Sequence, residues 1–259
     1  MNLSYICTGQ GETIIFIHSY LWDKNMWQPQ IDFLKNKYKC ISIDLPGHGD
    51  SSLLETNENI DLKTLAKKIV VFLNDMNIEK YIFVGLSVGG MLAPYIYELD
   101  KKRIKKMIIM DSYTGNEPDK SKNLYFSMLD TILSLKKIPE SMAEKIAPMF
   151  FSPATSQKKT KLYKEFYNSL VNTPADKIET IVKLGKAIFG RENSHNLLQK
   201  IDVPVIFITG ENDIPRPFNE AKEMSMLVKN SKLFSVKNAG HISNLENPDT
   251  VNSIFKNIL

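Results

Sequence analysis

The sequence predicts an α/β protein whose core is a doubly wound, mostly parallel sheet, and two observations support this prediction. Six short runs are almost wholly apolar, as is typical of strands buried on both faces of a parallel sheet; they span residues 13–18, 40–45, 81–86, 107–112, 205–210 and 232–236. Helical sequence lies between them. The clearest helix follows Asp61, a residue type that caps helix N-termini, and its apolar stripe consists of Leu62, Leu65, Ile69, Leu73 and Met76. Alternating strands and helices form a doubly wound sheet, which binds ligands at the carboxyl ends of its strands.

The alternation of strand and helix stops between about Ser112 and Lys200. This stretch contains helix-like segments near 122–137, 140–150, 157–171 and 175–189, separated by turns that contain proline, and no strand-like run interrupts them. We therefore expect a core formed by residues 1–111 and 201–259, with residues 112–200 inserted into it as a helical unit.

Length and composition indicate a globular protein and exclude several other classes. Of the 259 residues, 43% are hydrophobic and 24% are charged, and the formal net charge is +4. The basic residues are scattered, without the clustered stripe that nucleic-acid binding requires. The sequence shows neither a signal peptide nor an apolar run near the ~18 residues of a membrane span. Cys7 and Cys40 lack metal-ligand spacing. We expect a cytoplasmic protein with two buried thiols, no metal site and no nucleic-acid partner; the oligomeric state is open.

The motif Gly85-Leu86-Ser87-Val88-Gly89 lies between a predicted strand and a predicted helix. It matches the G-x-S-x-G pattern, in which small residues allow a sharp turn and the serine hydroxyl projects over the sheet edge. The amide of Val88, at a helix N-terminus, can donate to a developing oxyanion. The motif predicts a nucleophilic Ser87, although a purely structural glycine-rich turn would have the same sequence.

A serine hydroxyl needs a base to remove its proton and a carboxylate to orient that base. Asp213 follows the strand-like run 205–210, and His241 follows the run 232–236. The order serine, aspartate, histidine places all three at the same edge of one sheet. Asp111, at the end of the run 107–112, is an alternative acid. We favour Asp213 because the sequence Gly-x-x-Asp directly follows the later strand.

These motifs resemble those of the α/β-hydrolase superfamily over essentially the whole chain. The similarity includes residues 16–20 (FIHSY), at the position of the usual His-Gly oxyanion turn, residues 44–51 (DLPGHGDS), and His241 followed by Glu246-Asn247-Pro248. Within the superfamily the chain is most similar to small carboxylesterases, enol-lactone hydrolases and pimeloyl-carrier-protein methyl ester esterases. The resemblance implies an α/β-hydrolase fold in which residues 112–200 form a helical cap, or lid, over the active site.

The resemblance also implies an oxyanion hole, and the sequence departs from the family pattern near it. We assign the two donors to the amides of Tyr20 and Val88. Ser19 replaces the usual glycine after His18, so the backbone of the turn is less free there. Pro94 lies about two turns into the helix after Ser87, where it removes one hydrogen bond and is expected to kink the helix.

Large apolar side chains near the oxyanion turn and in the cap are candidates for the substrate pocket. They are Trp22, Phe126, Met128, Met149 and Phe150. The cap residues among them could equally form the core of the cap itself, and the sequence does not separate the two roles.

The combined pattern predicts a serine hydrolase that needs no cofactor, because it contains neither a dinucleotide-binding motif nor a P-loop. The expected substrate is a small-molecule carboxylic ester, lactone or thioester. Alternatives with the same triad are carbon–carbon bond hydrolysis and perhydrolysis, and a non-enzymatic receptor would keep the site as a binding pocket. Residues 113–200 contain 14 Lys and Arg against 9 Asp and Glu. Most simply these are solvated lysines, but they could also attract an acidic carrier protein.

Overall fold

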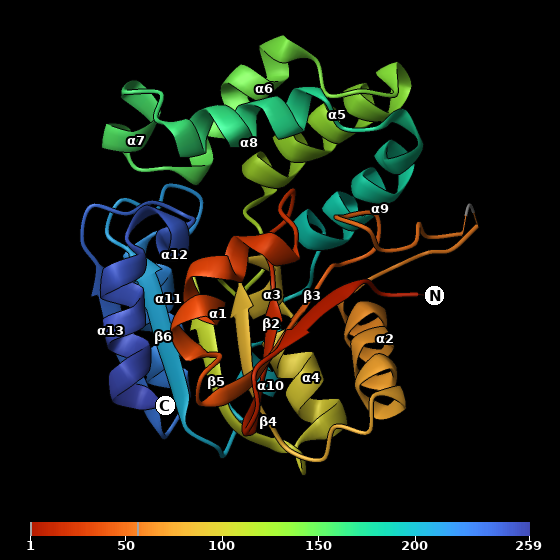
Figure 1. Cartoon of the computed structure of the whole chain (residues 1–259). Helices are drawn as coiled ribbons and strands as arrows, with labels where there is room; N and C mark the ends of the chain where they lie inside the picture. Colours follow the sequence, from red (N-terminus) through yellow and green to blue (C-terminus); the bar gives the residue numbers. More distant parts are fainter. Residues whose placement is uncertain (1, 56) are drawn as a thin grey trace.

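The computed structural model describes residues 2–55 and 57–259, and its centre is a seven-stranded sheet in the order β1-β3-β2-β4-β5-β6-β7 (Figure 1). All adjacent pairs are parallel except β1 and β3, which pair antiparallel. The strands are β1 (Tyr5–Thr8), β2 (Glu12–Ile17), β3 (Tyr38–Ile43), β4 (Tyr81–Leu86), β5 (Ile104–Met110), β6 (Val205–Gly210) and β7 (Ser231–Val236). Each of the six predicted runs forms one strand, and β1 adds an antiparallel edge. The predicted fold class is therefore confirmed. The expectation of two buried thiols holds for Cys40 but is wrong for Cys7, which is exposed because it lies on the edge strand β1.

Both faces of the sheet are buried, which explains why its central strands are continuously apolar. Alternate residues point to opposite sides, so that Ile15 and Phe83 belong to one apolar cluster while Ile14 and Val84 belong to another. The first face is covered by α2 (Leu62–Asp75), α4 (Ala93–Asp100), α10 (His195–Leu198) and α11 (Phe218–Leu227). The second is covered by η1 (Lys24–Trp27), α1 (Gln28–Leu34), α12 (Ser243–Glu246) and α13 (Pro248–Ile258). Helices on both faces are the doubly wound arrangement.

Local sequence signals place two of these helix boundaries. The Asp61 side chain accepts a hydrogen bond from the Thr64 amide at 2.6 Å, which caps α2 as predicted. Pro94 splits the predicted helix after Ser87 into α3 (Val88–Met91) and α4, and it occupies the first turn of α4. An N–H is not needed in a first turn, so the proline is accommodated by a break between two helices.

The helical insertion lies between β5 and β6 and forms a layer beyond the carboxyl ends of the strands (Figure 1). It consists of α5 (Asp119–Leu135), α6 (Glu140–Ile146), η2 (Ala147–Phe150), α7 (Pro153–Gln157), α8 (Lys161–Val171), η3 (Ala175–Lys177) and α9 (Ile178–Phe189). These helices enclose a third apolar cluster that includes Leu129, Phe151 and Phe166. The short α10, at the end of the predicted cap, packs against α4 and α11.

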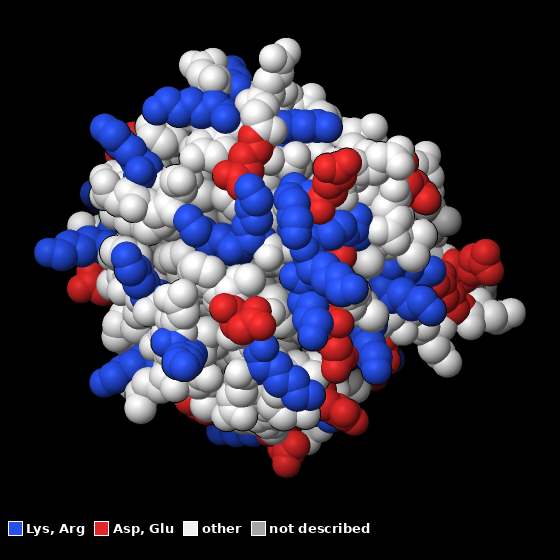
Figure 2. Space-filling view, turned by 90° about the horizontal axis from the view of Figure 1, so that it is seen from below, with Lys and Arg blue, Asp and Glu red and all other residues white. Residues whose placement is uncertain are grey.

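The division of the chain into 1–111 with 201–259 and 112–200 stays a prediction, and its first range includes residues 1 and 56, which lie outside the described residues. Within the described part of the chain, every helix is too short or too polar to cross a membrane. Figure 2 shows the face opposite the insertion, where lysine and arginine side chains gather near the amino ends of the parallel strands; they include the exposed Lys37, Lys80, Lys101, Lys102, Lys105 and Lys229.

Candidate active site

Ser87 occupies a strained turn between β4 and α3. Its backbone has φ 54° and ψ −114°, a conformation that residues other than glycine rarely adopt. A Cβ at Gly85 would lie 2.3 Å from the carbonyl oxygen of Gly89, and a Cβ at Gly89 would lie 2.4 Å from the carbonyl oxygen of Ile17. The two glycines of the motif are therefore required because strand, turn and helix approach too closely for a side chain.

Hydrogen bonds to the neighbouring strand keep this turn in place. The Ser87 amide donates to the Met110 carbonyl at 2.9 Å, and the Ser112 hydroxyl donates to the Ser87 carbonyl at 2.7 Å. With its backbone groups engaged, Ser87 retains a hydroxyl that is almost buried but lines a cavity at the sheet edge.

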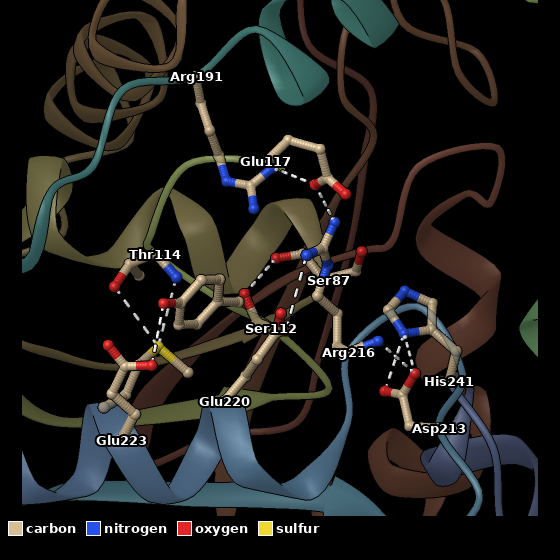
Figure 3. Close-up of polar contacts among 12 residues, drawn as sticks. Ser87, Ser112, Thr114, Glu117, Arg191, Asp213, Arg216, Glu220, Glu223 and His241 are labelled. Atoms are coloured by element: carbon tan, nitrogen blue, oxygen red, sulfur yellow. Dashed lines mark hydrogen bonds and ion pairs between the residues drawn. The ribbon is translucent and has the colours of Figure 1, made fainter. Parts of the chain in front are cut away.

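His241 and Asp213 form a buried pair at the same edge of the sheet (Figure 3). The Nδ1 atom of His241 lies 3.1 Å from Oδ1 and 3.0 Å from Oδ2 of Asp213. Asp213 belongs to the loop after β6 and accepts a further hydrogen bond at Oδ1 from the Arg216 amide, at 2.9 Å. His241 belongs to the loop after β7 and lines the cavity that contains Ser87. The structure thus brings together the three residues that the sequence predicts as a triad.

Asp111, the alternative acid, has different partners. Its Oδ1 accepts a hydrogen bond from the Gly210 amide at 2.7 Å, and its Oδ2 lies 2.5 Å from the Ser243 hydroxyl. Burial, reinforced by the negative charge of Asp213, raises the pKa of Asp111 well above its usual range. A carboxyl group whose two oxygens are engaged in this way is suited to joining loops, whereas Asp213 faces the imidazole.

Two buried histidines organise the turn after β2. Nε2 of His18 accepts a hydrogen bond from the Leu45 amide at 2.8 Å, and Nε2 of His48 accepts one from the Leu21 amide at 3.1 Å. Burial lowers the pKa of His18 to about 4 and that of His48 to about 3, so both rings are neutral at pH 7. A neutral ring is needed for this arrangement, because an imidazolium has no acceptor atom.

The turn held by these histidines contains Tyr20, whose hydroxyl donates to the carbonyl of Ile181 in α9 at 2.8 Å. Within residues 2–55 and 57–259, the amides of Tyr20 and Val88 have no hydrogen-bond acceptor. Both amides are therefore available to an oxyanion. Ser19, at the usual glycine position, is accommodated with its own amide directed to the sulfur of Met26 at 3.3 Å.

The cavity over Ser87 has a volume of about 90 Å³ and a largely apolar lining from the core and the insertion. Of the predicted pocket residues, Met128, Met149 and Phe150 line it, and the ring of Phe150 packs edge-on against that of His241 at 5.5 Å. Trp22 and Phe126 do not reach the cavity. Trp22 instead stacks on Phe166 with 4.6 Å between ring centroids, and Phe126 lies beneath the amino group of Lys122.

Comparison with known proteins agrees with this geometry. A family model described as the alpha/beta hydrolase fold matches residues 12–248. The chain belongs to the α/β-hydrolase family. Among relatives, a 3-oxoadipate enol-lactonase of Acinetobacter baylyi is 27% identical over 93% of this chain and 86% of its own. A pimeloyl-[acyl-carrier protein] methyl ester esterase of Legionella pneumophila is 25% identical over 96% and 95%.

The structural comparison shows the same fold. A thermophilic esterase from Thermogutta terrifontis, with malate bound, superposes with a TM-score of 0.89 at 21% identity, covering 98% of this chain and 92% of that one. Membership of the family supports a hydrolase activity for this α/β-hydrolase.

Several residues around the site were not identified from the sequence. Tyr125 and Arg216 line the cavity, and Arg216 forms a buried ion pair with Glu117 beside it (Figure 3). Arg216 lies only three residues after Asp213, so proximity to the predicted acid was an available signal. No local pattern indicated that its charge would be buried, because Glu117, its hydrogen-bonded partner, comes from a distant part of the chain.

Proposed function

We propose that this α/β-hydrolase cleaves a carboxylic ester, lactone or thioester through an acyl-enzyme formed on Ser87. The supporting observation is that Ser87, on a strained turn, lines the same cavity as the imidazole of a buried His241–Asp213 pair. In this arrangement Nδ1 of His241 donates to Asp213, which leaves Nε2 free to act as the base.

The first half of the reaction forms the acyl-enzyme. Oγ of Ser87 attacks the carbonyl carbon while Nε2 of His241 takes the hydroxyl proton, and Asp213 stabilises the resulting imidazolium. The amides of Tyr20 and Val88 donate to the oxyanion, and each such donor contributes about 3 kcal/mol to lowering the barrier. The tetrahedral intermediate then collapses, and the leaving alcohol or thiol departs with the proton from His241.

The second half returns the free enzyme. His241 removes a proton from a water molecule, the hydroxide attacks the acyl carbon, and the carboxylic acid is released as Ser87 regains its proton. The apolar lining of the cavity excludes bulk water, which strengthens the interaction between the oxyanion and its two donors.

Chemical labelling and turnover test this proposal together. A fluorophosphonate probe should label Ser87 alone, and the enzyme should release p-nitrophenol from a simple ester over many turnovers. Ser87→Ala and His241→Ala should each lower kcat by about 10³-fold or more, and the double variant should be little worse than either single one.

Two outcomes would contradict the proposal. Labelling of another residue, or a fully active Ser87→Ala, would remove Ser87 from the mechanism. A single stoichiometric burst followed by silence would instead identify a receptor that retains the hydrolase site.

The charge of the insertion supports an additional proposal about substrate delivery. Residues 113–200 carry five more positive than negative side chains, and one relative is an esterase of an acyl-carrier protein ester. We propose that an acidic carrier protein presents the acyl group to the insertion, since attraction between opposite charges accelerates association.

A further inference from the structure

Five polar side chains line the cavity over Ser87 among the residues that the structure describes, and three of them already have a role. Ser87 and His241 belong to the proposed triad, and the hydroxyl of Tyr20 donates to Ile181. The other two are Tyr125 and Arg216, in a lining that is otherwise apolar. Arg216 is thus a cationic side chain in the lining of the cavity to which the proposed mechanism gives no role.

The Arg216 guanidinium is buried and has more donors than acceptors. Its side chain is 4% exposed, and Nη2 donates to the carboxylate of Glu117. Nη1 lies 3.6 Å from Glu220, beyond a normal hydrogen bond, and Nε has no acceptor in the described chain. A buried donor without an acceptor costs about 1–3 kcal/mol. Nη1, which makes no hydrogen bond among the described residues, is therefore the donor left for an additional oxygen ligand.

A second buried arginine increases this excess of donors. Arg191 is 1% exposed and shares Glu117 with Arg216, at 3.1 Å from Nη1, while its own Nε and Nη2 have no acceptor among the described residues. The carboxylate of Glu117 is thus divided between two buried guanidinium groups. Burial raises the pKa of Glu220, the second carboxyl group near Arg216, to about 7.

We propose that Arg216, assisted by the hydroxyl of Tyr125, forms an anion subsite in the cavity, and that the ester or lactone cleaved at Ser87 carries a carboxylate. This inference rests on the proposed function. The planar guanidinium matches the two oxygens of a carboxylate, and the apolar lining suits a short carbon chain between the carboxylate and the reacting carbonyl.

Anchoring the carboxylate would also orient the substrate. When Arg216 holds the carboxylate at one end of the substrate, the carbonyl at the other end is placed over Ser87. A neutral chain of the same shape leaves the guanidinium donors unpaired, and this loss favours the anionic substrate.

Matched esters test the subsite. Mono-4-nitrophenyl glutarate and 4-nitrophenyl 5-methylhexanoate have nearly the same size and shape, because an isopropyl group in the second ester replaces the carboxylate of the first. We expect kcat/KM to favour the glutarate ester by about 10- to 100-fold, the range of a charge-assisted hydrogen bond, mainly through KM. Arg216→Met should abolish that preference, and Arg216→Lys should retain part of it. Hemi-esters of shorter and longer diacids should show one optimal length.

The control is Lys186→Met, which removes a positive charge from α9 that pairs with Asp130 and lies outside the cavity lining. It should leave the preference unchanged. An equal fall of both esters in Arg216→Met would overturn the subsite and leave Arg216 as a residue that positions the Asp213 loop. No preference for the glutarate ester in the wild type would overturn it as well.

Binding of glutarate separates this inference from the proposed function. Glutarate should raise the Tm of the wild-type protein and slow its labelling by the fluorophosphonate, whereas neutral pentane-1,5-diol should do neither. Hydrolysis of the neutral ester without any glutarate effect would refute the subsite alone. A glutarate effect on Tm in a protein that cleaves no ester would support the subsite and refute the proposed function.

Discussion

At the scale of single residues, the environment distinguishes two aspartates that end neighbouring strands. Asp213 faces His241, whereas the pKa of Asp111 is raised by burial and its oxygens are engaged by Gly210 and Ser243. Asp213→Asn should lower kcat on an activated ester by about 10³- to 10⁴-fold, because the imidazole can then settle in the wrong tautomer. Asp111→Asn should lower kcat by less than about tenfold, since the amide oxygen can still accept from the Gly210 amide and the amide nitrogen can donate to the Ser243 hydroxyl. Steady-state kinetics of the two variants would measure the difference.

Thermal unfolding of both variants provides the control. A Tm similar to that of the wild type shows that a loss of activity comes from an effect on catalysis and not from unfolding. If Asp111→Asn proved the more damaging variant at an unchanged Tm, the catalytic acid would be Asp111, directly after β5, and the assignment of Asp213 would be wrong.

At the scale of elements, the contact between α3 and β2 determines how Ser87 is presented. A Cβ at Gly89 would lie 2.4 Å from the Ile17 carbonyl oxygen, and the β2 backbone cannot move without disturbing the centre of the sheet. Gly89→Ala should therefore lower the free energy of unfolding by about 1–3 kcal/mol, the usual cost of overpacking. It should also lower kcat, because α3 begins immediately after Ser87. Denaturant unfolding and ester hydrolysis would measure the two effects.

Pro94→Ala is the matched control for this element, as it also introduces alanine beside α3. Pro94 occupies the first turn of α4, where a proline is tolerated and a new N–H requires no helical acceptor. This variant should change the free energy of unfolding by less than about 1 kcal/mol. Equal destabilisation in the two variants would show that the Gly89 contact has no special importance.

At the scale of the whole molecule, positive charge occurs on two separate faces. The exposed Lys158, Lys159 and Lys161 belong to the insertion, whereas Lys101, Lys102 and Lys105 belong to the opposite face in Figure 2. If an acidic carrier delivers the substrate to the insertion, kcat/KM for a carrier-bound ester should fall steeply as salt shortens the Debye length to about 8 Å. A small neutral ester should barely respond. Charge reversal at Lys158, Lys159 and Lys161 should reproduce the fall at low salt.

Charge reversal at Lys101, Lys102 and Lys105 provides the comparison, because it alters net charge equally on the face away from the cavity. Equal losses in both triple variants would indicate a general effect of net charge. An identical response of both substrates to salt would leave the lysines of the insertion as solubilising residues only.

The sequence alone determined the features that depend on local pattern. Burial on both faces makes a strand continuously apolar, so the five central strands could be located, and the shorter apolar run 232–236 located the edge strand β7. The glycines of residues 85–89 identify the sharp turn, and the chain order of Ser87, Asp213 and His241 identifies the predicted triad.

Tertiary structure decided what depends on contacts between distant residues. It directed Asp213 rather than Asp111 to His241 and stacked Trp22 on Phe166 away from the cavity. It also buried Arg216 against Glu117, 99 residues away. Local pattern indicates which apolar segments are buried, but the neighbours that a side chain meets are set by the packing of the insertion on the sheet.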